Sequence, residues 1–415
     1  MAKIAYIGLP AHGHTNPTLP IVKELVQRNH EVLYYNAESF RNKVEPTGVT
    51  YRPLPEPLPT EREISEAMSD FIQASLMLSK MSRPLAHFLI DDLAREKPDL
   101  VLYDSAAMWG YISARVNNIP QICIITTFVL DGSQGAIGFG TMARFILSSI
   151  RHIPSLLRWR RDMTKEFGAE NSGGITEYAD LNLVLTSKEF HPSNTMIDER
   201  FQFVGPSIDR STRDGSFLFD QLSEGKKVYI SLGTINHLNT SFYQAAFEAF
   251  ADYPAQFILS AGKNTDLASL GPIPQNFMVQ HYVPQLDLLQ KVDAFVTHGG
   301  MNSVHEGLYF GVPEVVVPQQ FEQLLNGKQV AQTGCGILLG DKKPYGRVTP
   351  SELKTAIKKV LTDSSYAENA KRIGRTLKAA GGYQQAADLI EEKLLLTASS
   401  GFDFKRSDLS LRREG

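Results

Sequence analysis

Short apolar runs alternate along the chain with longer segments in which apolar residues recur every three or four positions. Such alternation is typical of stacked βαβ units and a mostly parallel sheet. The apolar runs predict ten strands, at Lys3–Ile7, Glu31–Tyr35, Leu100–Tyr103, Gln121–Ile125, Leu181–Thr186, Lys227–Ile230, Gln256–Leu259, Phe277–Gln280, Ala294–Thr297 and Glu314–Val317. We therefore expect an α/β fold with two doubly wound, Rossmann-like parallel sheets.

The polar stretch from Val204 to Gly215, broken by Gly and Pro, has the composition of a domain linker. A chain of 415 residues suits two domains of about 200 residues each. We predict an N-terminal domain at 1–205, a linker at 206–216, a second domain at 217–382, a C-terminal helix at 383–397 and a disordered polar tail at 398–415. Ligands of open α/β sheets bind beyond the carboxyl ends of the strands, so the loops after each strand are the places to search.

Composition narrows the class of protein. Hydrophobic residues make up 42% of the chain and charged residues 21%, and a net charge of −3 gives no reason to expect nucleic acid. Cys123 lies in an apolar run and Cys335 between glycines, so neither a disulfide framework nor a thiolate metal site is indicated. No run approaches the ~20 apolar residues of a membrane span, and the first residues lack a signal-peptide core. We expect a cytoplasmic protein, and the sequence carries no signal for its oligomeric state.

The strongest local signal is the segment from Thr297 to Gly307, where an apolar strand runs into two glycines and a helix start. Backbone N–H groups and the helix dipole at such a point favour an anion, and a pyrophosphate fits. Asn302 and Ser303 can donate to phosphate oxygens, while Glu306, one turn later, can accept hydrogen bonds from ribose hydroxyls. The alternative is an ordinary strand-to-helix turn capped by Asn or Ser.

The loop after the first strand offers two imidazoles, His12 and His14. It lacks the G-x-G-x-x-G fingerprint, and no acidic residue ends the second strand, so a nicotinamide enzyme is not expected. His14, nearest the helix start, is the candidate general base, and Asp104 at the end of a neighbouring strand could hold its other nitrogen. Asp104 could instead cap the helix beginning near Ser105, and His12 is interpreted as a structural loop residue.

A His-x-His pair after a first strand can also bind zinc in a barrel-type metal-dependent hydrolase. The remaining histidines are scattered without a second ligand-like pair, and the strand count fits two open sheets better than one barrel. We therefore expect no metal.

Several motifs between Tyr282 and Gln329 occur in a characteristic order: Tyr-Val-Pro-Gln, Thr-His-Gly-Gly-Met-Asn-Ser-Val-His-Glu-Gly, Gly-Val-Pro and Phe-Glu-Gln-Leu-Leu-Asn. They resemble the nucleotide-sugar signature of family 1 glycosyltransferases. The early Gly-His-Thr-Asn-Pro loop and the late Gly-Gly-Tyr-Gln-Gln-Ala-Ala segment are most similar to the bacterial macrolide-type branch. The resemblance runs from residue 1 to about 397 and implies a GT-B fold, in which the first domain binds the acceptor, the second binds the donor, and a C-terminal helix crosses back.

Carried onto this chain, the resemblance makes His14 the catalytic base and Asp104 its partner. It implies that Glu322 and Gln323 bind sugar hydroxyls, and that an aromatic ring stacks on the base. The full implied donor set is Ser231, Thr234, Tyr282, Val283, Gln285, His298, Gly300, Asn302, Ser303, Glu306, Glu322 and Gln323. Tyr282 or Val283 stands where plant members have a stacking Trp, and Gln285 offers an amide to the base. Uridine is favoured and thymidine stays open.

The resulting hypothesis is an inverting, metal-independent transferase that moves a hexose, with glucose favoured, from a UDP-sugar and uses no further cofactor. The acceptor would be an apolar small molecule, phenolic, flavonoid-like or a macrolide. Residues of the expected acceptor segments are Phe71, Met77, Met81, Phe128, Phe139, Met142 and Phe145, which could equally be helix core. A non-catalytic helper protein would be expected to lose the base or the phosphate loop. A nucleotide-sugar epimerase or hydrolase would need carboxylates near the sugar.

Overall fold

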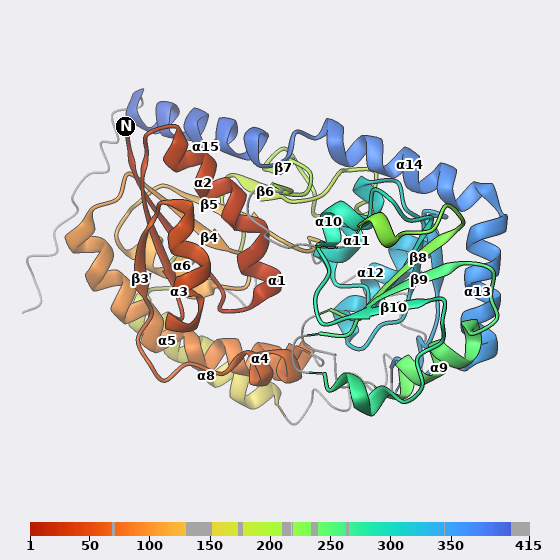
Figure 1. Ribbon diagram of the computed structural model, residues 1–415. Coiled ribbons are helices and arrows are strands. Elements are labelled where there is room, and N and C mark those ends of the chain that lie inside the picture. Colours follow the sequence, from red (N-terminus) through yellow and green to blue (C-terminus); the bar gives the residue numbers. More distant parts are fainter. Residues whose placement is uncertain are drawn as a thin grey trace, which may run out of the picture.

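Two parallel β-sheets, one in each half of the chain, organise the computed structural model (Figure 1). The structure describes residues 1–68, 71–129, 152–172, 177–209, 217, 219–233, 240–262, 265–343 and 345–399. The strands of the first sheet are β1 (Lys3–Ile7), β2 (Glu31–Asn36), β3 (Thr50–Pro53), β4 (Leu100–Asp104), β5 (Gln121–Ile125), β6 (Asn182–Val184) and β7 (Phe201–Phe203). Those of the second are β8 (Lys227–Ser231), β9 (Gln256–Ser260), β10 (Phe277–Gln280), β11 (Ala294–Thr297), β12 (Glu314–Val316) and β13 (Gly336–Leu338).

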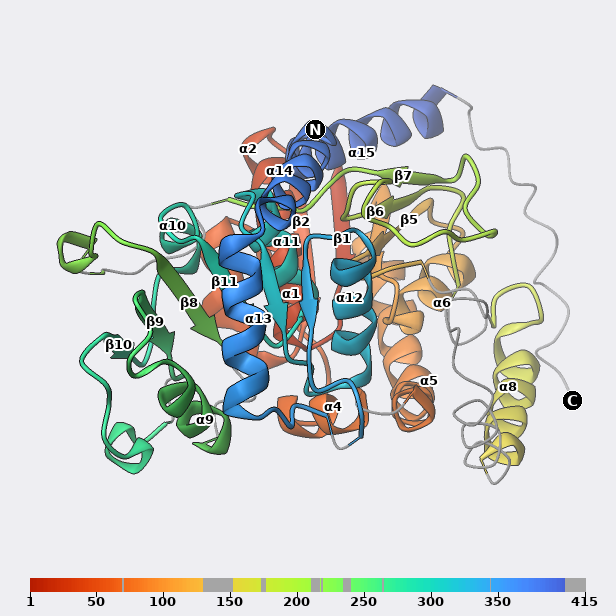
Figure 2. The ribbon, with the colours of Figure 1, turned by 90° about the vertical axis from the view of Figure 1, so that its right-hand side faces the viewer.

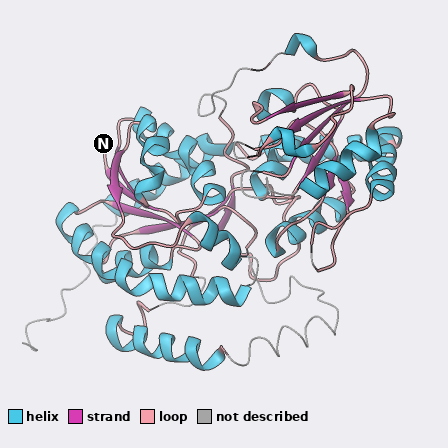
Figure 3. Ribbon diagram, turned by 60° about the horizontal axis from the view of Figure 1, so that its bottom comes forward, coloured by secondary structure: helices cyan, strands magenta, loops and turns pink. Residues whose placement is uncertain are grey.

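Helices flank each sheet. Figure 3 shows the two groups of strands in magenta with helices in cyan around each of them. In the first half they are α1 (His12–Thr15), α2 (Leu19–Gln27), α3 (Arg41–Val44), α4 (Glu61–Met68), α5 (Phe71–Glu96), α6 (Met108–Val116) and α8 (Ile153–Phe167). In the second half they are α9 (Thr240–Phe250), α10 (Gln285–Leu288), α11 (Met301–Tyr309), α12 (Phe321–Gln332), α13 (Pro350–Thr362), α14 (Ser364–Ala379) and α15 (Gly382–Ser399). Short 3₁₀ turns lie at Asn16–Thr18, Glu38–Phe40, Glu45–Thr47, Phe219–Gln221 and Leu267–Leu270.

The strand order of each sheet confirms the doubly wound α/β fold predicted from the sequence. In the described residues the orders are β3-β2-β1-β4-β5-β6-β7 and β10-β9-β8-β11-β12-β13, and every strand pair is parallel. The winding direction reverses between β1 and β4 in the first sheet and between β8 and β11 in the second. Crevices open at such switch points, beyond the carboxyl ends of the strands. The loops after these four strands are therefore placed to form a site.

Three strands were not predicted: β3, β7 and β13. All three lie at the edge of a sheet, are three or four residues long and carry partly exposed positions. Edge strands are buried on fewer sides than central ones, so their sequences lack the apolar run that marks a strand. Pro53 ends β3, where a missing N–H is tolerated.

Buried apolar side chains fill both faces of the first sheet. Leu89 and Trp109 belong to the layer on one face, while Val22 belongs to the layer on the other. Full burial of a side chain of this size stabilises the fold by roughly 1.5–3 kcal/mol. The second of these layers also contains Ile390 from α15, so the C-terminal helix completes the core of the first half.

Helix α15 lies along α2 at the edge of the first half, whereas α14 packs on α11 of the second (Figure 1). The Arg28 guanidinium donates to Asp388 at 2.6 Å and to Glu391 at 2.7 Å, which ties α15 to the end of α2. The turned view in Figure 2 shows α13, α14 and α15 following one another along the molecule. The C-terminal segment thus contacts both sheets' helices. No helix in the described part of the chain is long and apolar enough to cross a membrane.

Glu314 on β12 carries a fully buried carboxyl group that has no hydrogen-bond partner among the described residues. Burial raises the pKa of this carboxyl well above its usual range, because desolvation penalises the charged form. Its side chain abuts Gly307 of α11, where a Cβ atom would collide with the carboxyl oxygen.

Replacing Glu314 with Gln is expected to stabilise the protein at alkaline pH. A raised folded-state pKa stabilises the fold fully only below the ordinary carboxyl pKa, and that contribution is lost as pH rises toward the folded-state value. At a pH above the folded-state pKa of Glu314, the free energy of unfolding of the variant should exceed that of wild type by about 1.4 kcal/mol for each unit by which folding raises this pKa. Urea unfolding at pH 5 and pH 8 measures it, with the exposed Glu224→Gln as control. Equal pH dependence in wild type and Glu314→Gln would contradict the expectation.

Candidate functional site

His14 and Asp104 meet where β1 and β4 end side by side. His14 Nδ1 lies 2.8 Å from Asp104 Oδ2, with the His14 side chain 16% exposed and Asp104 fully buried. The other carboxyl oxygen of Asp104 accepts a hydrogen bond from the Ala106 backbone N–H at 2.9 Å. Asp104 therefore holds the imidazole and also accepts from the turn that follows β4. The alternative role as cap of a helix near Ser105 is wrong, because α6 begins at Met108 after Ala107.

The charge around His14 favours its protonated form. Burial by itself lowers the pKa of His14, but the charge and hydrogen bond of Asp104 raise it, and Glu322 adds to that effect. The net result is a pKa above the ordinary histidine value. Because Glu322 belongs to α12, this interaction links a carboxylate of the second domain to the imidazole of the first.

Thr126, just after β5, is a further neighbour of the imidazole that the sequence analysis missed. Its hydroxyl lies 3.1 Å from His14 Nδ1. The rule that led to Asp104 could have found it, because β5 is the next strand beside β4. His12 lies apart from this group, with its ring packed edge-on against Phe40.

The loop after β11 is built around the ring of His298. Gly299 has φ +86°, a left-handed conformation that favours glycine. A Cβ atom on Gly300 would lie 2.5 Å from His298 Nε2, and one on Gly233 would lie 2.6 Å from its Cε1. The two glycines, one after β8 and one after β11, therefore make the space that this ring occupies.

His298 is electrically neutral near pH 7. Burial lowers its pKa to about 4, and a hydrogen bond with the Ser231 backbone offsets this only in part. Its Nδ1 is buried and has no hydrogen-bond partner among the described residues. A buried ring nitrogen without a partner, next to the N-terminus of α11, suits a polar ligand group at this point.

Asn302 of α11 bridges the two domains. Its Nδ2 donates to the Gly13 carbonyl oxygen at 3.2 Å, in the loop that carries His14. Ser303 follows on the same helix and is half-buried. The first turn of α11 thus lies directly across from the imidazole loop.

Gln285 and Glu306 form one hydrogen-bonded unit. The amide Nε2 of Gln285 donates to Glu306 Oε2 at 2.7 Å, and its Oε1 accepts from the Tyr229 hydroxyl at 3.2 Å. Tyr282 is 42% exposed, whereas Val283 is 2% exposed and packs in an apolar cluster with Tyr229. Of the two stacking candidates, Tyr282 has the exposed ring and Val283 is enclosed by protein, and the role of each in donor binding stays a prediction.

Other predicted donor residues have roles within the protein. The Ser231 hydroxyl accepts from the Gly233 backbone N–H at 3.4 Å, and Gln323 is buried, with Oε1 accepting from the Gln319 backbone N–H at 2.8 Å. Glu322 Oε1 accepts from Asn326 Nδ2 at 3.2 Å. Thr234 lies outside the described residues. The buried Gln323 amide stabilises the turn after β12 in this structure.

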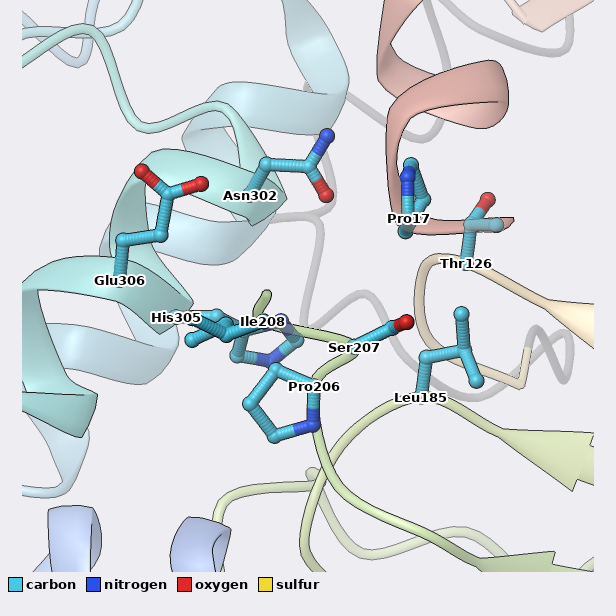
Figure 4. A pocket seen from close by; sticks show the side chains of 9 residues that line it. All are labelled: Pro17, Thr126, Leu185, Pro206, Ser207, Ile208, Asn302, His305 and Glu306. Carbon is cyan, nitrogen blue, oxygen red and sulfur yellow. The ribbon is translucent and has the colours of Figure 1, made fainter. Parts of the chain in front are cut away.

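A small pocket lies between the two domains, beneath this site (Figure 4). Its lining comes from the first domain, the segment after β7 and α11: Pro17, Thr126, Leu185, Pro206, Ser207, Ile208, Asn302, His305 and Glu306. His305 Nε2 lies 2.9 Å from the Thr186 hydroxyl and thereby joins α11 to the end of β6. Thr126, a neighbour of His14, and Glu306 lie on opposite sides of this pocket.

The predicted acceptor residues divide into three groups. Met81 is 6% exposed within the core of the first domain, and Phe128 is 4% exposed against Phe190, which favours the alternative of core packing for both, while their contact with an acceptor stays a prediction. Met77 is partly buried at the margin of that core. Phe71 begins α5, but its side chain lies outside the described part, as do all of Phe139, Met142 and Phe145.

Among the described residues, no group of three His, Cys, Asp or Glu side chains is arranged to hold a metal ion. Both cysteines are buried and unpaired.

Comparison with known proteins identifies the family. Residues 246–391 match the model of the C-terminal domain of erythromycin biosynthesis protein CIII-like proteins. The chain is 32% identical to the uncharacterized UDP-glucosyltransferase YojK of Bacillus subtilis, with 94% of this chain and 97% of that protein covered. It is 29% identical to the oleandomycin glycosyltransferase of Streptomyces antibioticus, with 95% and 91% covered.

The same result comes from solved structures. The crystal structure of the glycotransferase of kitacinnamycin superposes with a TM-score of 0.81 at 30% identity, covering 95% of this chain and 99% of that one. The fold is therefore GT-B. The chain belongs to the family of bacterial UDP-glycosyltransferases and macrolide glycosyltransferases, and it is a glycosyltransferase of the natural-product type.

Proposed function

We propose that the protein transfers a hexose from a UDP-sugar to a hydroxyl of an apolar small molecule, without a metal and with inversion at the anomeric carbon. One observation carries the proposal. In the first domain, His14 is hydrogen-bonded to Asp104 at 2.8 Å. From the second domain, the charge of Glu322 acts on His14, and Asn302 donates to the carbonyl oxygen of Gly13, the residue before His14. The candidate base His14 and the N-terminus of α11, the kind of helix end that binds phosphate groups, thus face each other across the domain boundary.

The chemistry that this arrangement supports is a single displacement. With Nδ1 held by Asp104, His14 would use Nε2 to take the proton of the acceptor hydroxyl as its oxygen attacks the anomeric carbon. The bond from that carbon to the nucleoside diphosphate breaks, and the diphosphate leaves with the electron pair. Attack and departure on opposite sides of the sugar invert its configuration.

The second domain would stabilise the leaving group. The N-terminus of α11 supplies backbone N–H groups and a positive dipole end where charge develops. His298 is neutral at pH 7, so it would contribute a hydrogen bond and not a positive charge. Glu306 would accept from the ribose, and the exposed ring of Tyr282 would stack on the base.

Donor and acceptor classes follow from the relatives and the chain together. One relative is named as a UDP-glucosyltransferase, which supports UDP-glucose as the first donor to test. Another is named for oleandomycin, which supports a macrolide or similar apolar acceptor. Glu322, whose carboxylate interacts with His14, would bind a sugar hydroxyl next to the base.

The test is acceptor-dependent release of UDP from UDP-glucose by the purified protein. Phenolic, flavonoid and macrolide acceptors are compared with simple sugars and peptides, and dTDP-glucose is the alternative donor. We expect release only with an apolar acceptor, and a product of inverted anomeric configuration by NMR. Acceptor-independent release would favour a hydrolase, and glycosylation of sugars or peptides alone would contradict the proposed acceptor class.

A further inference from the structure

Tyr229 on β8 is a buried tyrosine whose hydroxyl reaches the donor side of the site. Its side chain is 1% exposed, and its ring stacks on Phe295 of β11 with centroids 4.9 Å apart and planes 8° apart. The stacked rings fix the side chain in the sheet, so its hydroxyl has a defined position. That hydroxyl donates to Gln285 Oε1 at 3.2 Å.

The contact is the first link of a chain that ends at Glu306. Gln285 Nε2 donates in turn to Glu306 Oε2 at 2.7 Å, so three side chains from β8, α10 and α11 are joined in one line. Hydrogen bonds to a carboxylate are among the stronger ones in proteins. The Gln285 amide therefore fixes the plane and position of the Glu306 carboxylate.

An amide can make this contact in only one of its two orientations. If Gln285 were turned by 180°, its oxygen would face the Glu306 carboxylate, and two acceptors would oppose each other. The Tyr229 hydroxyl reinforces the orientation that the Glu306 carboxylate favours, because it donates to the amide oxygen on the opposite side of Gln285.

The surroundings of Tyr229 keep its proton in place. Burial raises the pKa of Tyr229, so the phenol stays protonated. The neighbouring Ser231 and Ser260 hydroxyls lower that pKa only in part. The phenol proton is donated to Gln285 Oε1.

We propose that Tyr229 is a positioning residue for the ribose of the donor nucleotide: through Gln285 it sets the orientation of the Glu306 carboxylate that receives the ribose hydroxyls. This proposal rests on the function proposed above, in which Glu306 contacts the ribose. Tyr229 does not touch the reacting atoms, so its loss should affect recognition of the nucleotide more than the chemical step.

The experiment compares Tyr229→Phe with wild type in binding UDP and 2′,3′-dideoxy-UDP, measured by calorimetry, and in turnover of the UDP-sugar. Tyr243→Phe is the matched control, because Tyr243 is a fully buried tyrosine of the same domain outside this hydrogen-bonded chain. We expect Tyr229→Phe to bind UDP about fivefold more weakly, the loss of roughly one hydrogen bond. Its affinity for the dideoxy nucleotide and its kcat at saturating donor should stay near those of wild type.

A double-mutant cycle with Glu306→Gln completes the test. If Tyr229 acts through Glu306, removing its hydroxyl from the Glu306→Gln variant should cause little further loss of UDP affinity. Additive losses, or equal weakening of both nucleotides by Tyr229→Phe, would overturn the positioning role while leaving the transferase intact. If wild-type protein bound UDP and its dideoxy analogue equally well, the proposed contact between Glu306 and the ribose hydroxyls would itself be contradicted.

Discussion

Replacing His14 with alanine is expected to lower kcat by about 10²–10⁴-fold, the range that a positioned general base contributes. The acceptor hydroxyl would lose its proton acceptor, whereas the residues of the second domain would stay in place. Binding of UDP, measured by calorimetry, should therefore change little. The measurement is acceptor-dependent UDP release at saturating donor, with His12→Ala as control, since His12 packs on Phe40 in the same loop. Wild-type rates in His14→Ala would refute the assigned base.

The pH dependence should separate the roles of His14 and Asp104. A base must be unprotonated to act, so kcat should rise with pH through the His14 pKa, which lies above the ordinary histidine value. In Asp104→Asn the carboxylate charge that raises this pKa is gone, and the rise should shift to lower pH. The plateau rate should also fall, because the imidazole is no longer held and its protonated form no longer stabilised. An unshifted pH profile in Asp104→Asn would show that Asp104 does not raise the pKa of the catalytic base.

The second large effect is expected from Gly300→Ala. Gly300 has φ −61° and ψ 136°, which alanine adopts without strain, so the consequence comes from the added Cβ alone. That atom would lie 2.5 Å from His298 Nε2, and the ring would have to move out of its place between Gly300 and Gly233. We expect the KM for the donor to rise by roughly tenfold or more, as for loss of a hydrogen bond to a charged group.

Gly225→Ala is the matched control for this variant, because a Cβ atom there would meet open space. Thermal unfolding of both variants shows whether the second domain is intact. Unchanged donor KM in a folded Gly300→Ala protein would mean that the position of His298 does not matter for the pyrophosphate.

Several features of the site could be predicted because they follow from local rules. The loops after β1, β4, β8 and β11 were identified from apolar runs and from the rule that ligands bind at strand ends. The structure brings His14 and Asp104, 90 positions apart, to hydrogen-bonding distance. The double glycine before α11 was also identified from the sequence, and in the structure Gly300 leaves room for the His298 ring.

Other features depend on contacts between distant segments and could not be predicted. Whether Met81, Phe128 or Val283 lines a cavity or packs in a core depends on which elements cover it, and nothing in a short window carries that information. Tyr229 looks like an ordinary strand residue in sequence. Its link to Gln285 and Glu306 exists only because β8, α10 and α11 converge.

The sequence by itself determined the alternation of strands and helices, the family motifs and the placement of polar residues at strand ends, because each depends on the spacing of residues along the chain. The tertiary structure alone decided the edge strands β3, β7 and β13 and the pairing of the imidazole loop with α11. These depend on long-range packing, in which the free energy comes from burying surfaces that the sequence does not show to be neighbours.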